Sequence, residues 1–234
     1  MDKLQKYKST DKMIDLIGDN YSLLQVMSRF GLSLGFGDKT VKEVCEMNNV
    51  DCQTFLVVVN FVAEGFSRMD GSADDISIPA LVDYLRQAHI YFLDYCLPAI
   101  RRKLIEAIDC SQDDVSFLIL KFFDGYMREV RKHMEYEEKT VFKYVDTLIH
   151  GNAPKNYQIS TFSKHHDQVG ERLTELKNII IKYCPAKANT NVLNAALFDI
   201  YACEEGLESH CKVEDYLFVP AILKLERRMR ENEK

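Results

Sequence analysis

The stretch RKHMEYEEKTVFKYV, residues 131–145, decides the fold, because it places a histidine and a glutamate inside an apolar helical pattern. Steps of three or four residues connect a stripe made of Phe123, Tyr126, Val130, His133, Glu137, Val141 and Tyr144. Side chains at these spacings share one face of an α-helix. The sequence therefore predicts a helix that carries His133 and Glu137 on the face that packs inside the protein.

The same pattern recurs in ESHCKVEDYLFVPAI, residues 208–222. Its stripe contains Leu193, Leu197, Ile200, Cys203, Leu207, His210, Glu214 and Leu217. A single His-x-x-x-Glu pair is most often a solvated ion pair. Here, however, His89, His133 and Glu137 all have counterparts 77 residues later, namely His166, His210 and Glu214. This repeat predicts a helix pair that is used twice, with the same polar side chains pointing inward.

Helical periodicity dominates the chain, and the alternation typical of strands is nearly absent. A polar stretch, residues 69–75, separates several short helical segments from four long ones, expected at 79–108, 111–149, 159–183 and 191–230. Pro98 is expected to kink the first long helix. The sequence thus predicts an all-α protein, with a small helical N-terminal domain (1–70) and an up-down four-helix bundle (76–230).

Composition excludes several classes of protein. The chain has 234 residues and a formal net charge of −6, without a long basic run, so binding of nucleic acid through a general field is not expected. No apolar stretch is long enough to span a membrane, and the polar start lacks a signal-peptide pattern. Seven irregularly spaced cysteines are typical of free thiols in a reducing compartment. We therefore expect a cytoplasmic protein.

Several carboxylates and imidazoles in one bundle core would be strongly destabilising without a counter-charge, because a buried carboxylate costs several kcal/mol. A bound multivalent cation resolves this, and imidazole with carboxylate suits iron, manganese or zinc. In His-x-x-x-Glu the histidine can cap one ion while the glutamate reaches across to a second. The predicted metal ligands are His89, His133, Glu137, His166, His210 and Glu214. With a bridging oxide or hydroxide, this set leaves about one open position on each of two octahedral ions.

Together with AHIYFLDYCLP (residues 88–98) and KHHDQVGERL (164–173), these motifs resemble the hemerythrin-like di-iron family. Ferritin-like proteins use Glu-x-x-His instead. The resemblance is closest to the repair-of-iron-centres proteins, because Gly170 stands where oxygen-carrying hemerythrins place a fifth histidine. It implies two iron ions, nitric oxide or dioxygen species as ligands, and iron–sulfur proteins as partners.

The N-terminal stretch, residues 10–51, also looks like the small N-terminal domain of that family, but Gly35 and Phe36 replace its usual Cys-Cys pair. Residues 40–62 imitate a helix-turn-helix. The would-be recognition helix, 52–63, has no lysine or arginine, which favours packing or dimerisation over DNA reading. Its apolar side chains are expected to be covered by the bundle or by a second copy of the chain, as in a homodimer.

Two functions stay open at this point. The first is a di-iron protein of stress defence that binds or turns over nitric oxide or dioxygen species and helps to restore iron–sulfur centres. The second is a reversible oxygen or iron sensor that signals to a protein partner. Neighbouring side chains receive no ligand role: His165 is expected to be solvated or to line the bundle mouth, and Cys203 and Tyr126 are interpreted as core residues.

Overall fold

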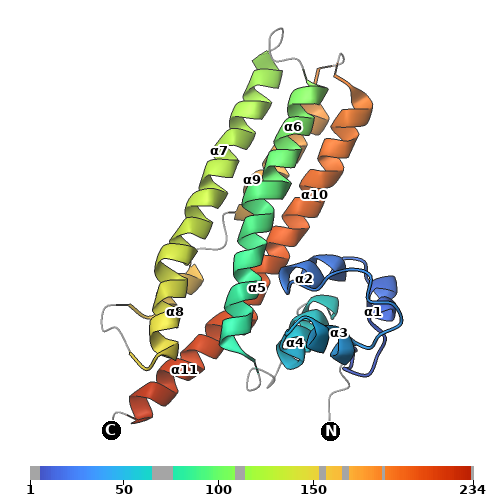
Figure 1. The fold of residues 1–234 in the computed structure, drawn as a ribbon. Helices are drawn as coiled ribbons and strands as arrows, with labels where there is room; N and C mark the ends of the chain where they lie inside the picture. The colour runs from blue at the N-terminus through green and yellow to red at the C-terminus, as the bar shows by residue number, and fades with distance from the viewer. Residues whose placement is uncertain are drawn as a thin grey trace. The chain divides into compact units, whose positions relative to one another are not determined.

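The computed structural model describes residues 6–64, 76–108, 114–152, 157–164, 169–185 and 188–232 (Figure 1). Within these ranges the regular secondary structure is helical, apart from one isolated antiparallel bridge between Lys12 and Thr40. The predicted all-α, hemerythrin-like fold class is confirmed. No helix in the described part of the chain is long and apolar enough to cross a membrane. The chain divides into two compact units, residues 1–88 with 212–234 and residues 89–211.

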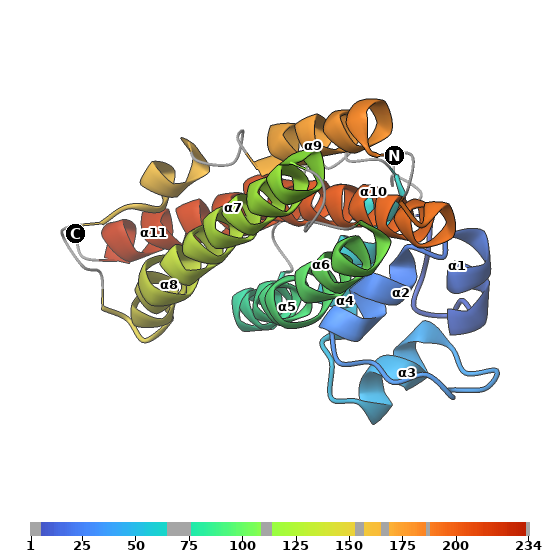
Figure 2. The same ribbon diagram turned by 90° about the horizontal axis from the view of Figure 1, so that it is seen from above.

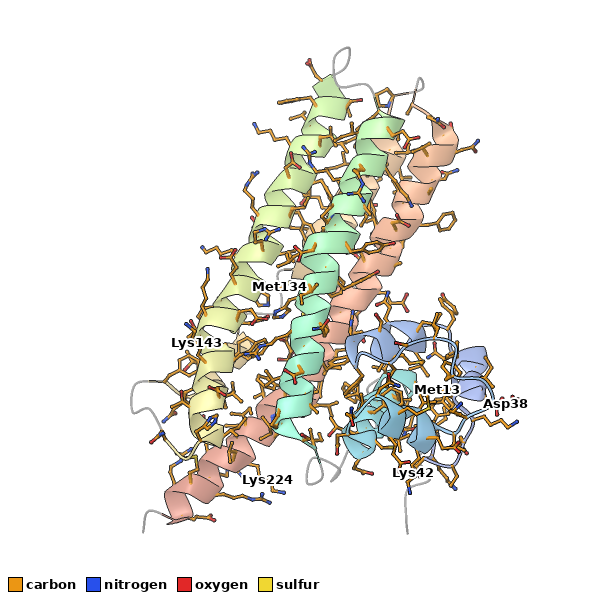
Figure 3. The ribbon with its side chains drawn as sticks, in the orientation of Figure 1. Met13, Asp38, Lys42, Met134, Lys143 and Lys224 are labelled. Carbon is orange, nitrogen blue, oxygen red and sulfur yellow. The ribbon has the colours of Figure 1, made fainter. Side chains whose placement is uncertain are left out.

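The first unit contains four short helices, α1 (Met13–Asp19), α2 (Leu23–Arg29), α3 (Val41–Met47) and α4 (Cys52–Ala63). Helix α4 is central among them, because it contacts both α2 and α3 and is buried from Thr54 to Phe61. The ring of Phe55 meets that of Phe30 edge-on at 5.4 Å. Figure 3 shows Met13 among these helices and the exposed Asp38 and Lys42 at their edge.

Helices α3 and α4, with the turn between them, correspond to residues 40–62, whose sequence imitates a helix-turn-helix. Thr40 and Glu43 make a reciprocal capping box at the start of α3, and the Asp51 carboxylate accepts from the Thr54 N–H at the start of α4. Asn49 adopts a φ of 55° in the intervening turn, a conformation that asparagine tolerates better than most residues. Because α4 is buried along most of its length, its apolar side chains are covered within the chain itself.

The first unit also includes most of α5 (Ile78–Ile90) and all of α11 (Val219–Asn232). Tyr84 of α5 lies 4.9 Å from Phe30, ring to ring, and its hydroxyl accepts a hydrogen bond from Arg29 at 3.2 Å. Phe61 of α4 contacts Tyr216 at 6.1 Å. Aromatic contacts therefore join the short helices to other segments of the same unit, and each contributes about 0.5–1.5 kcal/mol beyond its area.

The second unit contains α6 (Leu97–Ala107), α7 (Asp114–Tyr136), α8 (Phe142–Ile149), α9 (Val169–Tyr183) and most of α10 (Thr190–Val213). In Figures 1 and 2, α6 and α9 lie along α7. Ion pairs connect neighbouring helices: Arg101–Asp124 joins α6 to α7, Lys103–Asp199 joins α6 to α10, and Lys177–Glu204 joins α9 to α10. Figure 3 shows Met134, which is buried, and Lys143, which is exposed.

The Arg101–Asp124 pair gives a pH-dependent contribution to stability. The guanidinium contacts both carboxylate oxygens, at 2.6 and 3.1 Å, and its hydrogen bonds lower the pKa of Asp124. A lowered carboxyl pKa stabilises the folded state above the unfolded pKa, and this stabilisation is lost as the pH falls through the folded pKa. We expect Asp124→Asn to cost about 0.5–1 kcal/mol at neutral pH, measured by urea unfolding, and nothing below both pKa values. A double-mutant cycle with Arg101→Met should show no coupling at that low pH; coupling that persists there would contradict the assignment.

Three π-helical turns interrupt the long helices of the described residues, at Tyr91–Cys96, Glu137–Val141 and Glu214–Phe218. The second and third are again 77 residues apart, which extends the internal repeat from the side chains to the backbone. The first and third end two residues before Pro98 and Pro220, respectively. Because proline has no N–H to donate, it removes one helical hydrogen bond at each place. The sequence predicts that Pro98 can kink the first long helix; in the structure it is the second residue of α6, directly after the π turn.

The third long segment also differs from its prediction as a single helix over 159–183. Residues Ile159–Lys164 form a 3₁₀ helix, and α9 begins only at Val169. Side chains three residues apart eclipse in a 3₁₀ helix, which places Ile159 and Phe162 on one side, and both are fully buried. His165 and His166 lie outside the described residues, so their predicted positions stay predictions.

Candidate metal centre

Four of the six predicted ligands lie in one buried cluster. The ligand atoms of His89, Glu137, His210 and Glu214 are all within 4.8 Å of one another. Both carboxylates have no exposed surface, and the two imidazoles are 3% and 1% exposed. His89 lies near the end of α5 and His210 near the end of α10, while each glutamate is the first residue of a π turn.

The fifth predicted ligand, His133, joins this cluster through Glu137. Its Nε2 lies 2.7 Å from Oε1 of Glu137, and Nε2 of His89 lies 2.8 Å from Oε2 of the same carboxylate. Each carboxylate oxygen of Glu137 therefore lies within hydrogen-bonding distance of a different imidazole. This is the arrangement expected of a carboxylate that connects two histidine-capped positions, and it follows from the four-residue spacing of His133 and Glu137 on one helical face.

Glu138 belongs to the site as well, although its sequence position does not reveal it. Its Oε1 lies 2.9 Å from Nδ1 of His89. A carboxylate on one ring nitrogen fixes the tautomer and leaves the other nitrogen for a metal. Burial lowers the pKa of His89, but its hydrogen bonds to Glu137 and Glu138 outweigh this and raise the pKa overall. Because His89 and Glu138 are 49 residues apart, no periodicity along one helix connects them.

The π turns position the two buried glutamates. Such turns are rare, and within α-helices they occur frequently at functional sites. Glu137 and Glu214 open turns of equal length, with His133 and His210 one helical turn earlier in regular α-helix. The sequence predicts the shared face but contains no signal for the change of helix type.

Aromatic side chains keep the surroundings of the cluster apolar. The rings of His89 and Phe142 stack with centroids 5.5 Å apart, and Phe92 meets His210 at 6.1 Å. Both phenylalanines are fully buried. In such a medium two carboxylates need a larger counter-charge than the imidazoles beside them supply. The donor set, nitrogen and oxygen without thiolate, fits iron, manganese or zinc.

Replacing Glu138 tests its positioning role. We expect Glu138→Gln to weaken metal binding about 10- to 100-fold, the usual cost of losing a partner that orients a ligand. Competition with a chelator of known affinity measures this. Glu135→Gln is the matched control. Glu135 is on the same helical segment as Glu138 and forms an ion pair with the exposed Lys139. Equal affinity in the two variants would show that His89 needs no such support.

Comparison with known proteins agrees with this geometry. Residues 80–222 match the family described as the hemerythrin HHE cation-binding domain. The match includes all six predicted ligands and more than half of the chain. A comparison with curated proteins finds no match. The chain therefore belongs to the hemerythrin HHE cation-binding family, whose domains bind metal, typically iron.

Proposed function

We propose that the protein is a non-haem di-iron protein that binds or turns over nitric oxide or dioxygen species. The observation that carries this proposal is the pair of fully buried carboxylates, Glu137 and Glu214, clustered with imidazoles in an apolar core. Each glutamate follows a histidine by four residues, so the same half-site occurs twice. Two half-sites with one bridging carboxylate each favour two ions over one.

The residues divide into three roles in this proposal. His89, His133, His166 and His210 would be terminal ligands, and Glu137 and Glu214 would bridge the ions, with an oxide or hydroxide completing the set. Glu138 holds His89 with Nε2 toward the cluster. Phe92 and Phe142 exclude water beside it. Bound iron would supply Fe(II)/Fe(III) redox chemistry and an open coordination position.

We further propose a role in the repair of iron–sulfur centres under nitrosative or oxidative stress, in the cytoplasm, with iron–sulfur proteins as partners. The support is the resemblance of the bundle motifs and residues 10–51 to the repair-of-iron-centres proteins. Gly170, in place of a fifth histidine, favours reactivity over reversible oxygen carriage. No role for nucleic acid or membrane is proposed.

Iron content and optical spectra test the central proposal. Protein purified anaerobically after iron-replete expression should hold two irons per chain, and its spectrum should change on addition of nitric oxide or oxygen. Manganese- and zinc-loaded samples serve as controls for the response to each gas. One tightly held zinc and no iron would contradict the proposal.

A reversible oxygen or iron sensor is the second candidate. It is favoured by the N-terminal turn, where Gly35 (φ 89°) and Phe36 replace a cysteine pair that a thiol-based repair role would use. A sensor should release oxygen intact when the gas is removed, and its oxygen spectrum should return fully to the starting state. A reactive centre should instead retain oxidised iron after the gas is removed.

A further inference from the structure

A second buried layer of reactive side chains occurs in residues 89–211, away from the predicted ligands. It consists of Cys96, Tyr126 and Cys203. Each is seven residues from a predicted ligand, in the order His89, His133 and His210. Because α6 runs opposite to α7 and α10 (Figure 1), these spacings bring the three residues to one level of the bundle. Seven residues are about two helical turns, or about 10 Å.

The two thiols in this layer touch each other. Cys96 and Cys203 share a side-chain hydrogen bond, although they come from different helical segments. They are 8% and 2% exposed. This hydrogen bond, and then burial, hold the pKa of Cys203 well above its usual range. The thiolate is the form that attacks oxidants, so burial and a raised pKa protect Cys203 from direct attack by oxidants in bulk water.

Tyr126 completes the layer. Its ring is 1% exposed, and its hydroxyl is buried without a hydrogen-bond partner among the described residues. Burial raises the pKa of Tyr126, and the neighbouring Cys203, Cys211 and Glu204 add to this effect. A buried hydroxyl beside two thiols can donate a hydrogen bond to the first thiolate that forms.

We propose that Cys96 and Cys203 are a two-electron reserve for the metal centre, and that they form a disulfide when the centre is oxidised. This inference rests on the proposed di-iron function. The two S–H bonds break and one S–S bond forms, which releases two electrons and two protons. The electrons reduce two Fe(III) ions to Fe(II), and the protons leave to water past the part-exposed carboxylate of Glu204. A small thiol such as dithiothreitol restores the reduced pair by exchange.

The chain contains its own control for this reaction. Cys45 and Cys52, in the first unit, also share a side-chain hydrogen bond. Burial raises the pKa of both thiols, but Cys52 is only half-buried. An oxidant in solution therefore reaches this pair more easily than the buried pair of Cys96 and Cys203. Oxidation through the metal centre should select Cys96 and Cys203, whereas oxidation from solution should select Cys45 and Cys52.

The experiment follows thiols and iron together. The reduced, Fe(II)-loaded full chain is oxidised with a limited amount of air and then kept anaerobic. Fe(II) is assayed with a ferrous chelator after acid quenching, and disulfides are identified by differential alkylation and mass spectrometry. We expect one Cys96–Cys203 disulfide for every two Fe(II) regained, while Cys45 and Cys52 stay reduced. Cys96→Ala and Cys203→Ser should keep their iron but remain ferric, and Cys45→Ala should behave as the parent chain.

The possible failures are distinguishable. Two bound irons without the disulfide would overturn this inference and leave the proposed function intact. The same disulfide in metal-free protein exposed to the same air would also overturn it, because the pair would then be oxidised independently of the centre. A chain that binds no iron would overturn the proposed function and this inference with it, and iron content reports that result separately. Circular dichroism of the two cysteine variants verifies that they are folded.

Discussion

Glu137→Ala should lose at least about 100-fold in metal affinity, more than any single histidine variant of the same site. Both oxygens of Glu137 lie against imidazole nitrogens, at 2.7 and 2.8 Å, so one side chain contacts two proposed metal positions. Loss of a residue that merely orients a ligand already costs about 10- to 100-fold, and loss of a shared ligand should exceed this range. Iron per chain after equilibrium dialysis against a chelator measures the effect.

Two further variants make this result specific. Glu214→Ala should behave like Glu137→Ala, because Glu214 has the equivalent place in the internal repeat and is equally buried. Glu135→Ala is the negative control, since that side chain is about half exposed, two residues earlier on the same helical segment. If Glu135→Ala and Glu137→Ala lost the same amount of iron, general damage to the helix would explain both, and a bridging role would be rejected.

Removal of the metal should lower the melting temperature substantially. Occupancy at a thousand times the dissociation constant stabilises a folded protein by about 4 kcal/mol for each site. In domains of this size each kcal/mol corresponds to about 2–4 °C. One ion should therefore add about 8–16 °C, because without it the carboxylates of Glu137 and Glu214 remain fully buried beside each other.

Differential scanning calorimetry of the same preparation before and after chelation measures this shift. Restoring iron should return the melting temperature to its starting value, which separates loss of metal from irreversible damage. In the Glu137→Ala chain, chelation should shift the melting temperature far less. An unchanged melting temperature in the parent chain after complete iron removal would contradict a metal-dependent core.

The sequence predicts the helices and most of the cluster because both depend on short-range periodicity. The stripe through His133 and Glu137 is buried as predicted, except that His133 keeps 16% of its side chain exposed. The stripe through His210 and Glu214 is buried from Ile200 onward, whereas Leu193 and Leu197 are only partly buried. Apart from the start of α9, the ends of the long helical segments also fall close to their predicted positions, since capping residues and prolines act locally. Core residues and metal ligands on one helix face recur at the same spacing of three or four residues, so one periodic pattern predicts both.

What the sequence does not predict depends on contacts between distant segments. Glu138 belongs to the site because it contacts His89, which is 49 residues away in the sequence. Cys96 likewise contacts Cys203 of another helical segment. Cys203 was interpreted only as a small core residue, because its burial follows from periodicity and its neighbour does not. The 3₁₀ helix at 159–164 was predicted as α-helix because Ile159 and Phe162, three residues apart, satisfy either spacing.

The π turns give the two halves of each repeated motif different mechanical properties. His133 and His210 are held by regular α-helix, whose hydrogen bonds resist twisting. Glu137 and Glu214 begin turns that contain one residue more than an α-helical turn, which makes the backbone there more compliant. In the proposed di-iron centre, a carboxylate on such a segment would change from bridging two ions to binding one without bending the long helix. The backbone thus holds the histidines more rigidly than the glutamates, which suits the proposed di-iron centre.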